Sequence, residues 1–309
     1  ALVLPALPAH AQRAYRDGGD GEGSYRLTGV GRFRVHLHRE RGRAAAVIRA
    51  LPSRVPSLAG LGLPPGVDAL ARVPRGLVII GGATGSGKST TMAALVDAIN
   101  RHEAKHIITI EDPIEYEHAN QRSVVQQIEV GADTPDFPAA LRSALRQAPD
   151  VIVVGEMRDP ETMRIALAAG ETGHLVLTTL HTTDVASTLA RMCDSFPDER
   201  QPTIRQEIAA ALSAVWVQTL LPARHGGGRV PAAELLVVGY GARQHIRRNA
   251  LQHLHQEMTI TRRQGSFTIE ESLVRLVKAG LVTRDEAVIR ANHLEDFNRA
   301  LDDGTNPGA

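Results

Sequence analysis

Gly82-Ala83-Thr84-Gly85-Ser86-Gly87-Lys88-Ser89 is the stretch that decides the fold of this chain. It matches the pattern G-x-x-x-x-G-K-[ST] of a phosphate-binding loop. The apolar run 77–80 before it predicts a buried strand, and the apolar residues of 91–100 after it recur at helical spacing. A strand, this loop and a helix in that order predict a site for a nucleoside triphosphate.

The residue types of the loop fit the chemistry of a phosphate. Glycines let backbone N–H groups point inward, and the following helix directs the positive end of its dipole at the same anion. Lys88 could reach the terminal phosphates, and the Ser89 hydroxyl could complete a magnesium shell. Lysine occurs only at Lys88, Lys105 and Lys278, which argues against a glycine turn with a chance lysine. The residues expected to bind ATP are Gly82, Thr84, Gly85, Ser86, Gly87, Lys88, Ser89 and Thr90.

Length and composition limit the class of protein. The 309 residues suffice for one large or two ordinary domains. A net charge of +1 and an aromatic content of 3% disfavour non-specific binding of nucleic acid, which needs a basic field or stacking rings. Cys193 is the only cysteine, so an intrachain disulfide and a multi-cysteine zinc site are excluded. We interpret Cys193 as a small buried hydrophobe.

The sequence shows no sign of a membrane span. No stretch reaches the roughly 18 apolar residues that a spanning helix needs. Residues 1–10 resemble a signal peptide only faintly, because they lack a basic region and contain Pro5 and Pro8. The chain also starts without methionine, and we interpret its start as the cut end of a longer N-terminal domain. A cytoplasmic location is predicted.

Proline, glycine and hydrophobic periodicity indicate the organisation of the chain. A polar loop is expected at 17–23, followed by strands at 32–37 and 44–51. From residue 74 to about 240, strand and helix patterns alternate, which is typical of a parallel α/β sheet, and only helical patterns follow. The predicted division is an N-terminal part at 1–57, a linker at 58–73 in which proline and glycine block regular structure, an α/β core at 74–240 and a helical part at 241–309. The polar tail 302–309 is expected to fray.

Polar residues follow three of the predicted strands. The strand 106–110 runs into Glu111 and Asp112, and the strand 151–154 is followed by Glu156. A third strand, 175–179, is flanked by His174 and His181. Ligands of open α/β sheets bind at the carboxyl ends of the strands. Glu156 could therefore order magnesium or polarise an attacking water beside the phosphate loop.

Each of these residues has a structural alternative. An acidic residue after a strand is often the N-cap of the next helix, and this alternative is open for Asp112 and Asp159. A single histidine is more often structural than functional, and the chain has 13. The order of phosphate loop, two acid-terminated strands and a third polar strand end favours a P-loop ATPase.

Three runs carry a family resemblance: GGATGSGKSTT at 81–91, TIEDPIE at 109–115 and the run from LRSALRQ to LTTLHT at 141–182. They resemble the phosphate-loop, Asp-box, Walker B and His-box segments of the type II/IV secretion ATPase superfamily. Similarity extends from 31–55 to 273–287, and it is greatest to the retraction ATPases of type IV pili. The resemblance implies a homohexameric ring, with a PAS-like α+β domain, here partial, over a RecA-like ATPase domain.

The resemblance also assigns roles to residues. It implies that Glu156 is the catalytic glutamate and that Glu111 and Asp112 are the acidic residues of the Asp box. It implies that His174 and His181 form the His box, which relays the nucleotide state.

Further roles follow from the same resemblance. Arg34, Arg41 and Arg49 match arginines that approach the phosphates when the domains close, although a solvated, salt-bridged face is the ordinary alternative for each. Ser89 and Glu156 would hold Mg²⁺, in part through water. An arginine that meets transition-state charge only after closure would couple hydrolysis to domain motion.

The implied function is a motor at the cytoplasmic face of the inner membrane. ATP hydrolysis would drive pilus retraction, and so twitching motility, by acting on an inner-membrane platform protein. A pilus assembly or type II secretion ATPase is the alternative within the family, but these usually carry a four-cysteine zinc module. The retraction-linked motif AIR appears as Gly241-Ala242-Arg243, which weakens the assignment to retraction. A non-hydrolysing accessory subunit and a nucleic-acid translocase are alternatives of other classes.

Overall fold

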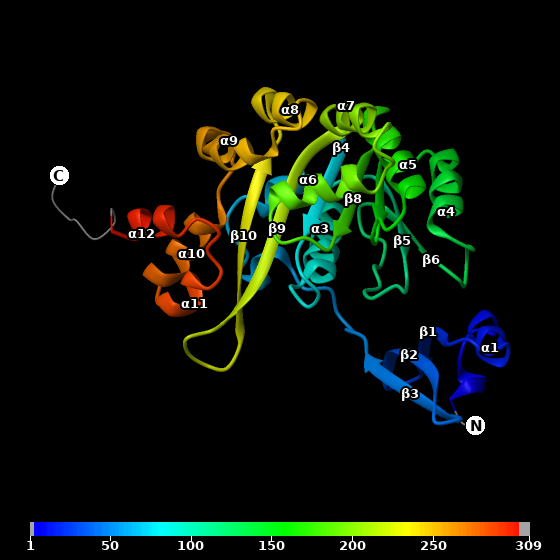
Figure 1. Ribbon diagram of the computed structural model, residues 1–309. Helices are drawn as coiled ribbons and strands as arrows, with labels where there is room; N and C mark the ends of the chain where they lie inside the picture. The colour runs from blue at the N-terminus through cyan, green and yellow to red at the C-terminus, as the bar shows by residue number, and fades with distance from the viewer. Residues whose placement is uncertain (1–2, 303–309) are drawn as a thin grey trace.

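The chain forms two β-sheets of different size. The computed structural model describes residues 3–302. It contains a sheet of seven strands and an N-terminal sheet of three. Figure 1 shows the small sheet below the large one, joined to it by a single extended connection, with the last helices on the opposite side of the large sheet. The predicted mixed α/β fold is confirmed.

The large sheet has the order expected of a P-loop core. All neighbouring strands are parallel except the edge strand β10, which forms an antiparallel hairpin with β9. The strands predicted at 77–80, 106–110, 151–154 and 175–179 are confirmed. In spatial order the strands are β10 (Arg229–Val237), β9 (Leu212–Pro222), β4 (Gly76–Gly81), β8 (Leu175–Leu180), β7 (Val151–Val154), β5 (His106–Glu111) and β6 (Val124–Glu129).

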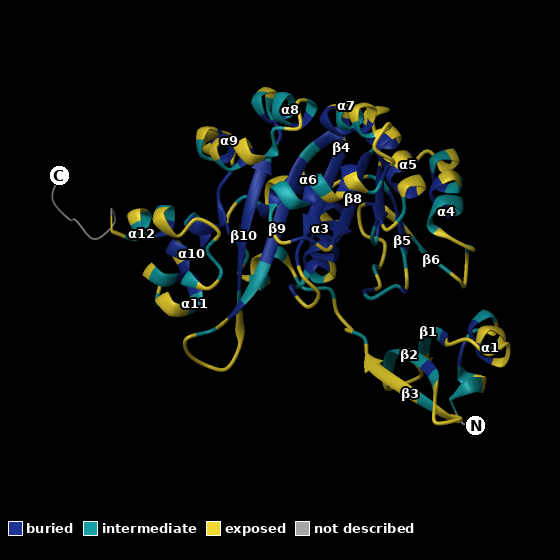
Figure 2. Ribbon diagram, viewed as in Figure 1, coloured by how far each residue is buried: buried dark blue, intermediate teal, exposed yellow. Residues whose placement is uncertain are grey.

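Helices bury both faces of this sheet. Side chains alternate along a strand, so Leu77 and Ile79 join one hydrophobic cluster while Val78 and Ile80 join the other. Figure 2 shows the central strands buried between these layers. Two-sided burial explains why the strands are continuous apolar runs. The first face carries α4 (Phe137–Ala144), α5 (Pro160–Glu171), α6 (Val185–Asp194) and α7 (Gln201–Ala211), and the second carries α2 (Val67–Leu70) and α3 (Lys88–His102).

The part of the chain after Gly239 is helical up to the end of the described residues, apart from one isolated bridge at Phe267. Its last three helices bury a separate cluster around Leu273 and Phe297, which also includes Leu221 at the end of β9. The predicted helical C-terminal part is therefore confirmed, whereas the tail 303–309 lies outside the described residues. The helices are α8 (Tyr240–Arg247), α9 (Leu254–Ile260), α10 (Ile269–Lys278), α11 (Arg284–Val288) and α12 (Leu294–Asp302).

The N-terminal sheet is small and mostly exposed. Its antiparallel strands are β1 (Gly21–Leu27), β2 (Gly31–Glu40) and β3 (Arg43–Ala50), and α1 (Ala9–Arg16) packs on β1. Tyr15, Val35 and Leu37 belong to its small core, which is separate from the other clusters. β3 is exposed along nearly its whole length. The two predicted strands are confirmed, but the loop predicted at 17–23 is too long, because β1 already begins at Gly21.

Residues 58–73 are more ordered than a proline- and glycine-rich linker suggests. They contain the 3₁₀ turn Leu58–Leu61 and α2. Val67 and Leu70 are buried in the cluster that includes Val78 and Met92. The expectation that proline and glycine block regular structure there is wrong, because these apolar side chains gain a buried surface by packing against the core.

Two further expectations can be compared with the structure. The helix after the phosphate loop begins at Lys88, three residues before the predicted 91, because helical periodicity becomes visible only with the first apolar residue. Cys193 is buried at 4% exposure, and burial raises the pKa of its thiol to about 11, as expected of a small buried hydrophobe. Among residues 3–302, no helix combines the length and the apolar character needed to cross a bilayer.

Candidate nucleotide site

The phosphate loop joins β4 to α3 at the carboxyl edge of the large sheet. Gly82, Gly85 and Gly87 have φ angles of 150°, 80° and 90°, which favour glycine. A Cβ atom on Gly82 would lie 2.3 Å from Ser86 Oγ and 2.6 Å from the carbonyl oxygen of Gln218. The tight loop therefore requires glycine at this position.

Lys88, near the end of the phosphate loop, has its side chain buried within that loop. Its Nζ donates to the carbonyl oxygens of Gly82, at 2.8 Å, and Ala83, at 3.0 Å, and lies 3.3 Å from His181 Nδ1. Burial lowers the pKa of Lys88, and the charge of Glu156 partly offsets this effect. The ammonium is thus held at the mouth of the loop, where a terminal phosphate could replace its carbonyl partners.

The loop also has an unsatisfied polar atom. Ser86 Oγ is buried and has no hydrogen-bond partner, so a phosphate oxygen would supply the acceptor that it lacks. Ser89 is exposed at the start of α3, where a magnesium ion could reach its hydroxyl. Thr90 Oγ1 and the Tyr116 hydroxyl, which both line the cleft, are hydrogen-bonded at 3.0 Å, and Thr84 Oγ1 lies 3.4 Å from His181 Nδ1. These residues fit a nucleotide and its magnesium ion.

Glu156 lies beside the loop, just after β7. Its side chain is 16% exposed, pairs with Arg158 and lies 3.4 Å from His181 Nε2. His181 therefore stands between Lys88 and Glu156, with Nδ1 toward the lysine and Nε2 toward the carboxylate. Burial, followed by the charge of Lys88, lowers the pKa of His181. A neutral imidazole with its proton on Nε2 satisfies both neighbours.

Glu111 and Asp112 lie at the end of β5, as predicted, and both line the cleft. Thr109 Oγ1 donates to Glu111 Oε1 at 2.7 Å, and burial raises the pKa of Glu111. Partial desolvation, followed by repulsion from Glu22, raises the pKa of Asp112. Asp112 precedes a cis proline and caps no helix. Asp159, by contrast, is the N-cap of α5, so the structural alternative is correct for that residue.

The two predicted histidines lie at opposite ends of β8. His181 follows this strand and lines the cleft, whereas His174 precedes it and lies at the opposite edge of the sheet. The His174 ring instead lies 3.1 Å from the carbonyl oxygen of Ala169 near the end of α5. His174 therefore does not line the nucleotide cleft, because the six residues of β8 separate it from the edge where His181 lies, and its part in relaying the nucleotide state stays a prediction.

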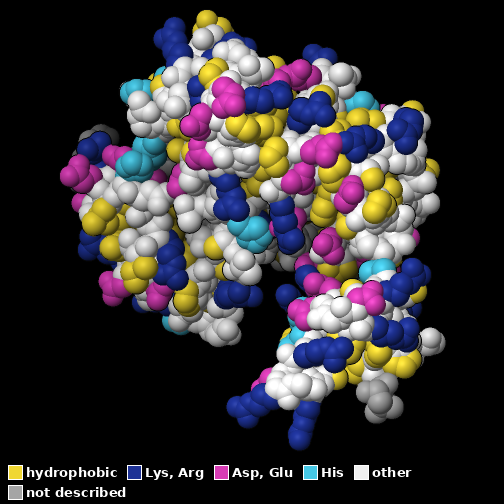
Figure 3. Space-filling view, turned by 45° about the vertical axis from the view of Figure 1, so that its right-hand side comes forward, with side chains coloured by type: hydrophobic (Ala, Val, Ile, Leu, Met, Phe, Trp, Pro, Cys, Tyr) yellow, Lys and Arg dark blue, Asp and Glu magenta, His cyan; other side chains and the backbone are white. Residues whose placement is uncertain are grey.

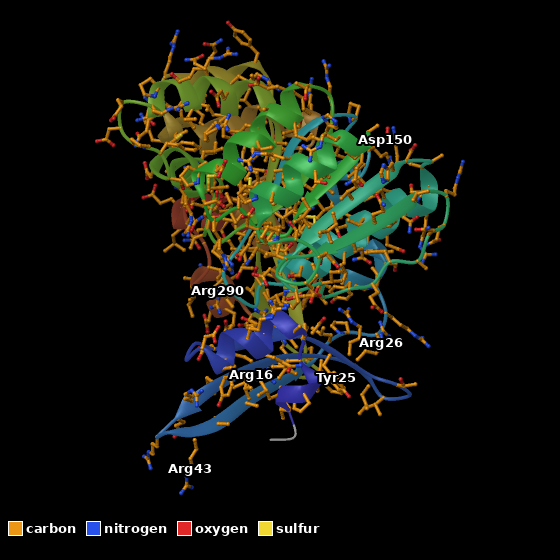
Figure 4. All side chains as sticks on the ribbon, turned by 90° about the vertical axis from the view of Figure 1, so that its right-hand side faces the viewer. Arg16, Tyr25, Arg26, Arg43, Asp150 and Arg290 are labelled. Carbon is orange, nitrogen blue, oxygen red and sulfur yellow. The ribbon has the colours of Figure 1, made fainter. Side chains whose placement is uncertain are left out.

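Two of the three predicted arginines line the cleft, and the third does not. Arg34 and Arg49 are partners across β2 and β3, and both line the cleft. Arg34 pairs with Glu22 at 2.5 Å. Arg41 lies in the turn between the two strands, and Figure 4 shows nearby Arg43 at the tip that points away from the large sheet. The prediction that Arg41 lies at this cleft is therefore wrong, because the turn of the β2–β3 hairpin points away from the phosphate loop.

The cleft has a volume of about 690 Å³ and lies between the phosphate loop and the N-terminal sheet. Figure 3 shows the N-terminal lobe set off by a hollow with basic, acidic and histidine side chains at its rim. Sequence reasoning missed Arg158 and Tyr116, which line it, and Arg229, whose Nη1 donates to the Gly85 carbonyl oxygen at 3.3 Å. Arg158 was detectable from its position two residues after Glu156.

Gln218 is the most consequential residue that the sequence analysis missed. It lies on β9, is 3% exposed, and its Nε2 donates to the Ser86 carbonyl oxygen at 2.7 Å. Its Oε1 accepts from Thr91, at 2.9 Å, and from the Trp216 indole, at 2.8 Å. The amide oxygen and nitrogen thus each have a hydrogen-bond partner, and the Gln218 side chain supports the phosphate loop from β9. No local sequence pattern indicates this contact.

A parallel sheet covered on both faces and a phosphate loop at its carboxyl edge define a P-loop nucleoside triphosphate-binding protein. The model of the family described as type II/IV secretion system protein matches residues 32–296. The chain belongs to this family.

Individual relatives are similar over nearly the whole chain. A twitching motility protein of Neisseria gonorrhoeae is 41% identical over 96% of this chain and 79% of its own length. The type IV pilus retraction ATPase PilT of Pseudomonas aeruginosa is 41% identical over 96% of this chain and 86% of its own. A crystal structure of the pilus retraction motor PilT with bound ADP has a TM-score of 0.87 and 42% identity, covering 96% of this chain and 85% of that one.

Proposed function

We propose that this chain is a subunit of a hexameric ATPase motor that drives the retraction of type IV pili, and with it twitching motility. One observation carries the proposal: His181 stands between the phosphate-loop lysine and Glu156 at the carboxyl edge of the sheet. The similarity to retraction ATPases supports the biological setting. We further propose that the motor acts on an inner-membrane platform protein from the cytoplasmic side.

The phosphate loop would hold the substrate before reaction. The loop N–H groups and Ser86 Oγ would donate to phosphate oxygens, while Lys88 would exchange its carbonyl partners for the terminal phosphates. Ser89 and Glu156 would hold Mg²⁺, in part through water. The ion would neutralise the charge that develops on the phosphates.

Glu156 would orient the attacking water as the catalytic glutamate. Arg158 and His181 hold its carboxylate in the structure, so it would act from a fixed position. Glu111 and Asp112 face the same cleft and would support the water or the metal shell. His181 would sense the γ-phosphate, because it would lose the Lys88 contact when the lysine turns to the nucleotide.

The N-terminal sheet would supply the closing wall. Arg34 and Arg49 line the cleft opposite the loop and would stabilise the transferred phosphoryl group after closure. This role rests on a division of the chain into a partial PAS-like domain at 1–57, a linking segment at 58–73, a RecA-like core at 74–240 and its helical extension at 241–309. Hydrolysis would then be coupled to domain motion.

Arg243 is the remaining residue of the altered AIR motif. It donates to the carbonyl oxygens of Ala209 and Ala210 at the end of α7, so it ties α8 to the core. Gly241 stands in front of Glu257, whose Oε1 would lie 2.4 Å from an added Cβ. An alanine at position 241 would therefore require the Glu257 carboxylate to shift, and the choice of retraction over assembly rests on the relatives.

The experiment is steady-state hydrolysis and nucleotide binding by purified chain with and without Glu156→Gln. We expect the variant to keep its affinity for ATP and to lose a factor of about 10²–10⁴ in kcat. Glu171→Gln, at an exposed position near the end of α5, is the matched control and should retain full activity. A Glu156→Gln rate within a few-fold of wild type would remove Glu156 from this role.

The wild-type protein also distinguishes the alternative classes. ATP binding without turnover in the presence of Mg²⁺ would identify a non-hydrolysing accessory subunit. Turnover stimulated by DNA, together with salt-sensitive DNA binding, would identify a nucleic-acid translocase. The proposed motor hydrolyses ATP without DNA.

A further inference from the structure

A second cluster of metal-binding side chains lies in the C-terminal helical part. His255, His293 and Asp296 each offer one ligand atom, and these atoms all lie within 4.8 Å of one another. His255 belongs to α9 and Asp296 belongs to α12. His293 is the residue directly before α12. None of the three lines the nucleotide cleft. The proposed ATPase function gives this cluster no role.

Buried neighbours anchor the backbone that carries His293 and Asp296. The N–H groups of Asn292 and His293 donate to Glu270 Oε1 at 2.9 and 2.8 Å, and Glu270 is 1% exposed. Phe297 is fully buried and fixes the first turn of α12 beside Asp296. The backbone on which the cluster is built is therefore anchored before any ion binds, which lowers the cost of assembling a site.

The distances suit a transition metal. His255 Nε2 lies 3.1 Å from Asp296 Oδ2, and the rings of His255 and His293 have centroids 3.8 Å apart at an angle of 38°. Ligand atoms on one tetrahedral zinc ion lie about 3.3 Å apart, because zinc bonds are about 2.0–2.1 Å long. Two ligand atoms already have this spacing, and rotation of the exposed His293 ring would bring in the third.

The donor set selects the class of ion. Imidazole nitrogen favours zinc and its transition-metal neighbours over Mg²⁺ and Ca²⁺, which prefer oxygen ligands. The carboxylate of Asp296 supplies negative charge, and its other oxygen, Oδ1, lies 3.7 Å from the exposed Arg299. A His255–Asp296 hydrogen bond alone would not explain why a second imidazole lies against the first.

We propose that His255, His293 and Asp296 bind a Zn²⁺ ion that fastens the start of α12 to α9. The ion takes three protein ligands and completes its shell with water. It stabilises the packing of the C-terminal helices, a role independent of the phosphate loop. The proposed function can therefore fail without affecting this site.

The test uses untagged, chelator-treated full chain without nucleotide. Isothermal titration with Zn²⁺ should show one ion per chain, and Co²⁺ should give visible absorption bands from imidazole and carboxylate ligation. Zn²⁺ should also raise the thermal unfolding midpoint, because it binds the folded state. His293→Ala and Asp296→Asn should each weaken zinc binding by at least about tenfold, since each removes a ligand.

Two controls keep the test decisive. His253→Ala removes a nearby exposed histidine whose ring lies 5.4 Å from that of His245, outside the cluster, and it should bind zinc like the wild type. The metal-free midpoint of His293→Ala should equal that of the wild type, because the side chain is exposed. Equal zinc affinity in wild type, His293→Ala and Asp296→Asn, or no zinc binding by the wild type, would overturn the site.

Discussion

The two walls of the nucleotide cleft are built from different interactions. The phosphate-loop wall is stabilised by Gln218, a buried side-chain amide that forms three hydrogen bonds. The opposite wall carries Arg34 and Arg49 on a small sheet with its own separate hydrophobic cluster. A buried, satisfied network fixes geometry, whereas a wall without a shared apolar core can move.

The contacts between the small sheet and the core are polar. Ser24 Oγ donates to Glu129, at 3.0 Å, and Arg32 Nη2 donates to the Ile114 carbonyl oxygen, at 3.1 Å. Arg26 pairs with Glu117, and Figure 4 shows Arg26 on the part of the small sheet near the core. Such contacts orient a domain without contributing the free energy of a large apolar interface. The difference between the buried network under the phosphate loop and these polar contacts supports an account in which the phosphate-loop wall is fixed and the N-terminal wall closes on it.

The largest effect on stability is expected from removing Gln218, whose side chain supports the phosphate loop from β9. Gln218→Leu leaves the Ser86 carbonyl, the Thr91 hydroxyl and the Trp216 N–H buried without their partners. We expect a loss of about 2–4 kcal/mol in the free energy of unfolding and roughly tenfold weaker ATP binding. Denaturant unfolding and nucleotide titration measure both. Gln256→Leu, on the exposed face of α9, is the control, and an equal effect of both variants would contradict the supporting role of Gln218.

A smaller effect is expected from titrating His181, which lies on the phosphate-loop side of the cleft between Lys88 and Glu156. Burial and Lys88 hold the pKa of His181 below its ordinary 6.5, so the ring is neutral at pH 7. Protonation at lower pH would end its contact with the lysine in the free protein, and kcat/KM for ATP, which reports the free enzyme, should fall with a midpoint below pH 6.5. The unfolded chain takes up this proton more readily, so stability also decreases as pH falls below 6.5. In His181→Gln the acid limb of the rate profile should disappear; an unchanged limb would assign it to another group.

The smallest effect is expected at the surface contact between the two halves. Arg26→Gln removes an ion pair whose two side chains are both more than half exposed, so the thermal midpoint should stay unchanged within error. Differential scanning calorimetry of wild type and Arg26→Gln measures this directly. A clear fall in the thermal midpoint would show that the N-terminal sheet and the core are rigidly joined. It would contradict the contrast between a fixed wall and a moving wall.

The sequence predicted those parts of the site that follow from local patterns. The loop and the acidic residues after β5 and β7 were found because a motif and the strand-end rule place them at one edge. Gln218 could not be predicted, because its partners Ser86 and Thr91 are more than a hundred residues away along the chain. The position of His174 away from the cleft could be inferred from the sequence, since the two ends of a strand lie on opposite edges of a sheet.

The N-terminal fragment shows a different limit of sequence reasoning. The strand patterns at 32–37 and 44–51 predicted β2 and β3, whereas β1 was not predicted as a strand. The choice among the arginines required the register that pairs Arg34 with Arg49 and leaves Arg41 in the turn. The cluster at His255 and His293 was missed because α10, α11 and their loops separate its residues along the chain. Pairing between distant segments is set by packing, which no local window contains.

The most direct test of a fixed half and a closing half compares binding with catalysis in Arg34→Ala/Arg49→Ala. The account predicts a fall in kcat of about 10²–10³-fold with the Kd for ATP within about threefold of wild type, because these arginines would meet the phosphates only after closure. Arg41→Ala/Arg43→Ala, at the hairpin tip, should behave like the wild type. An unchanged kcat, or a Kd that rises as much as kcat falls, would contradict the account.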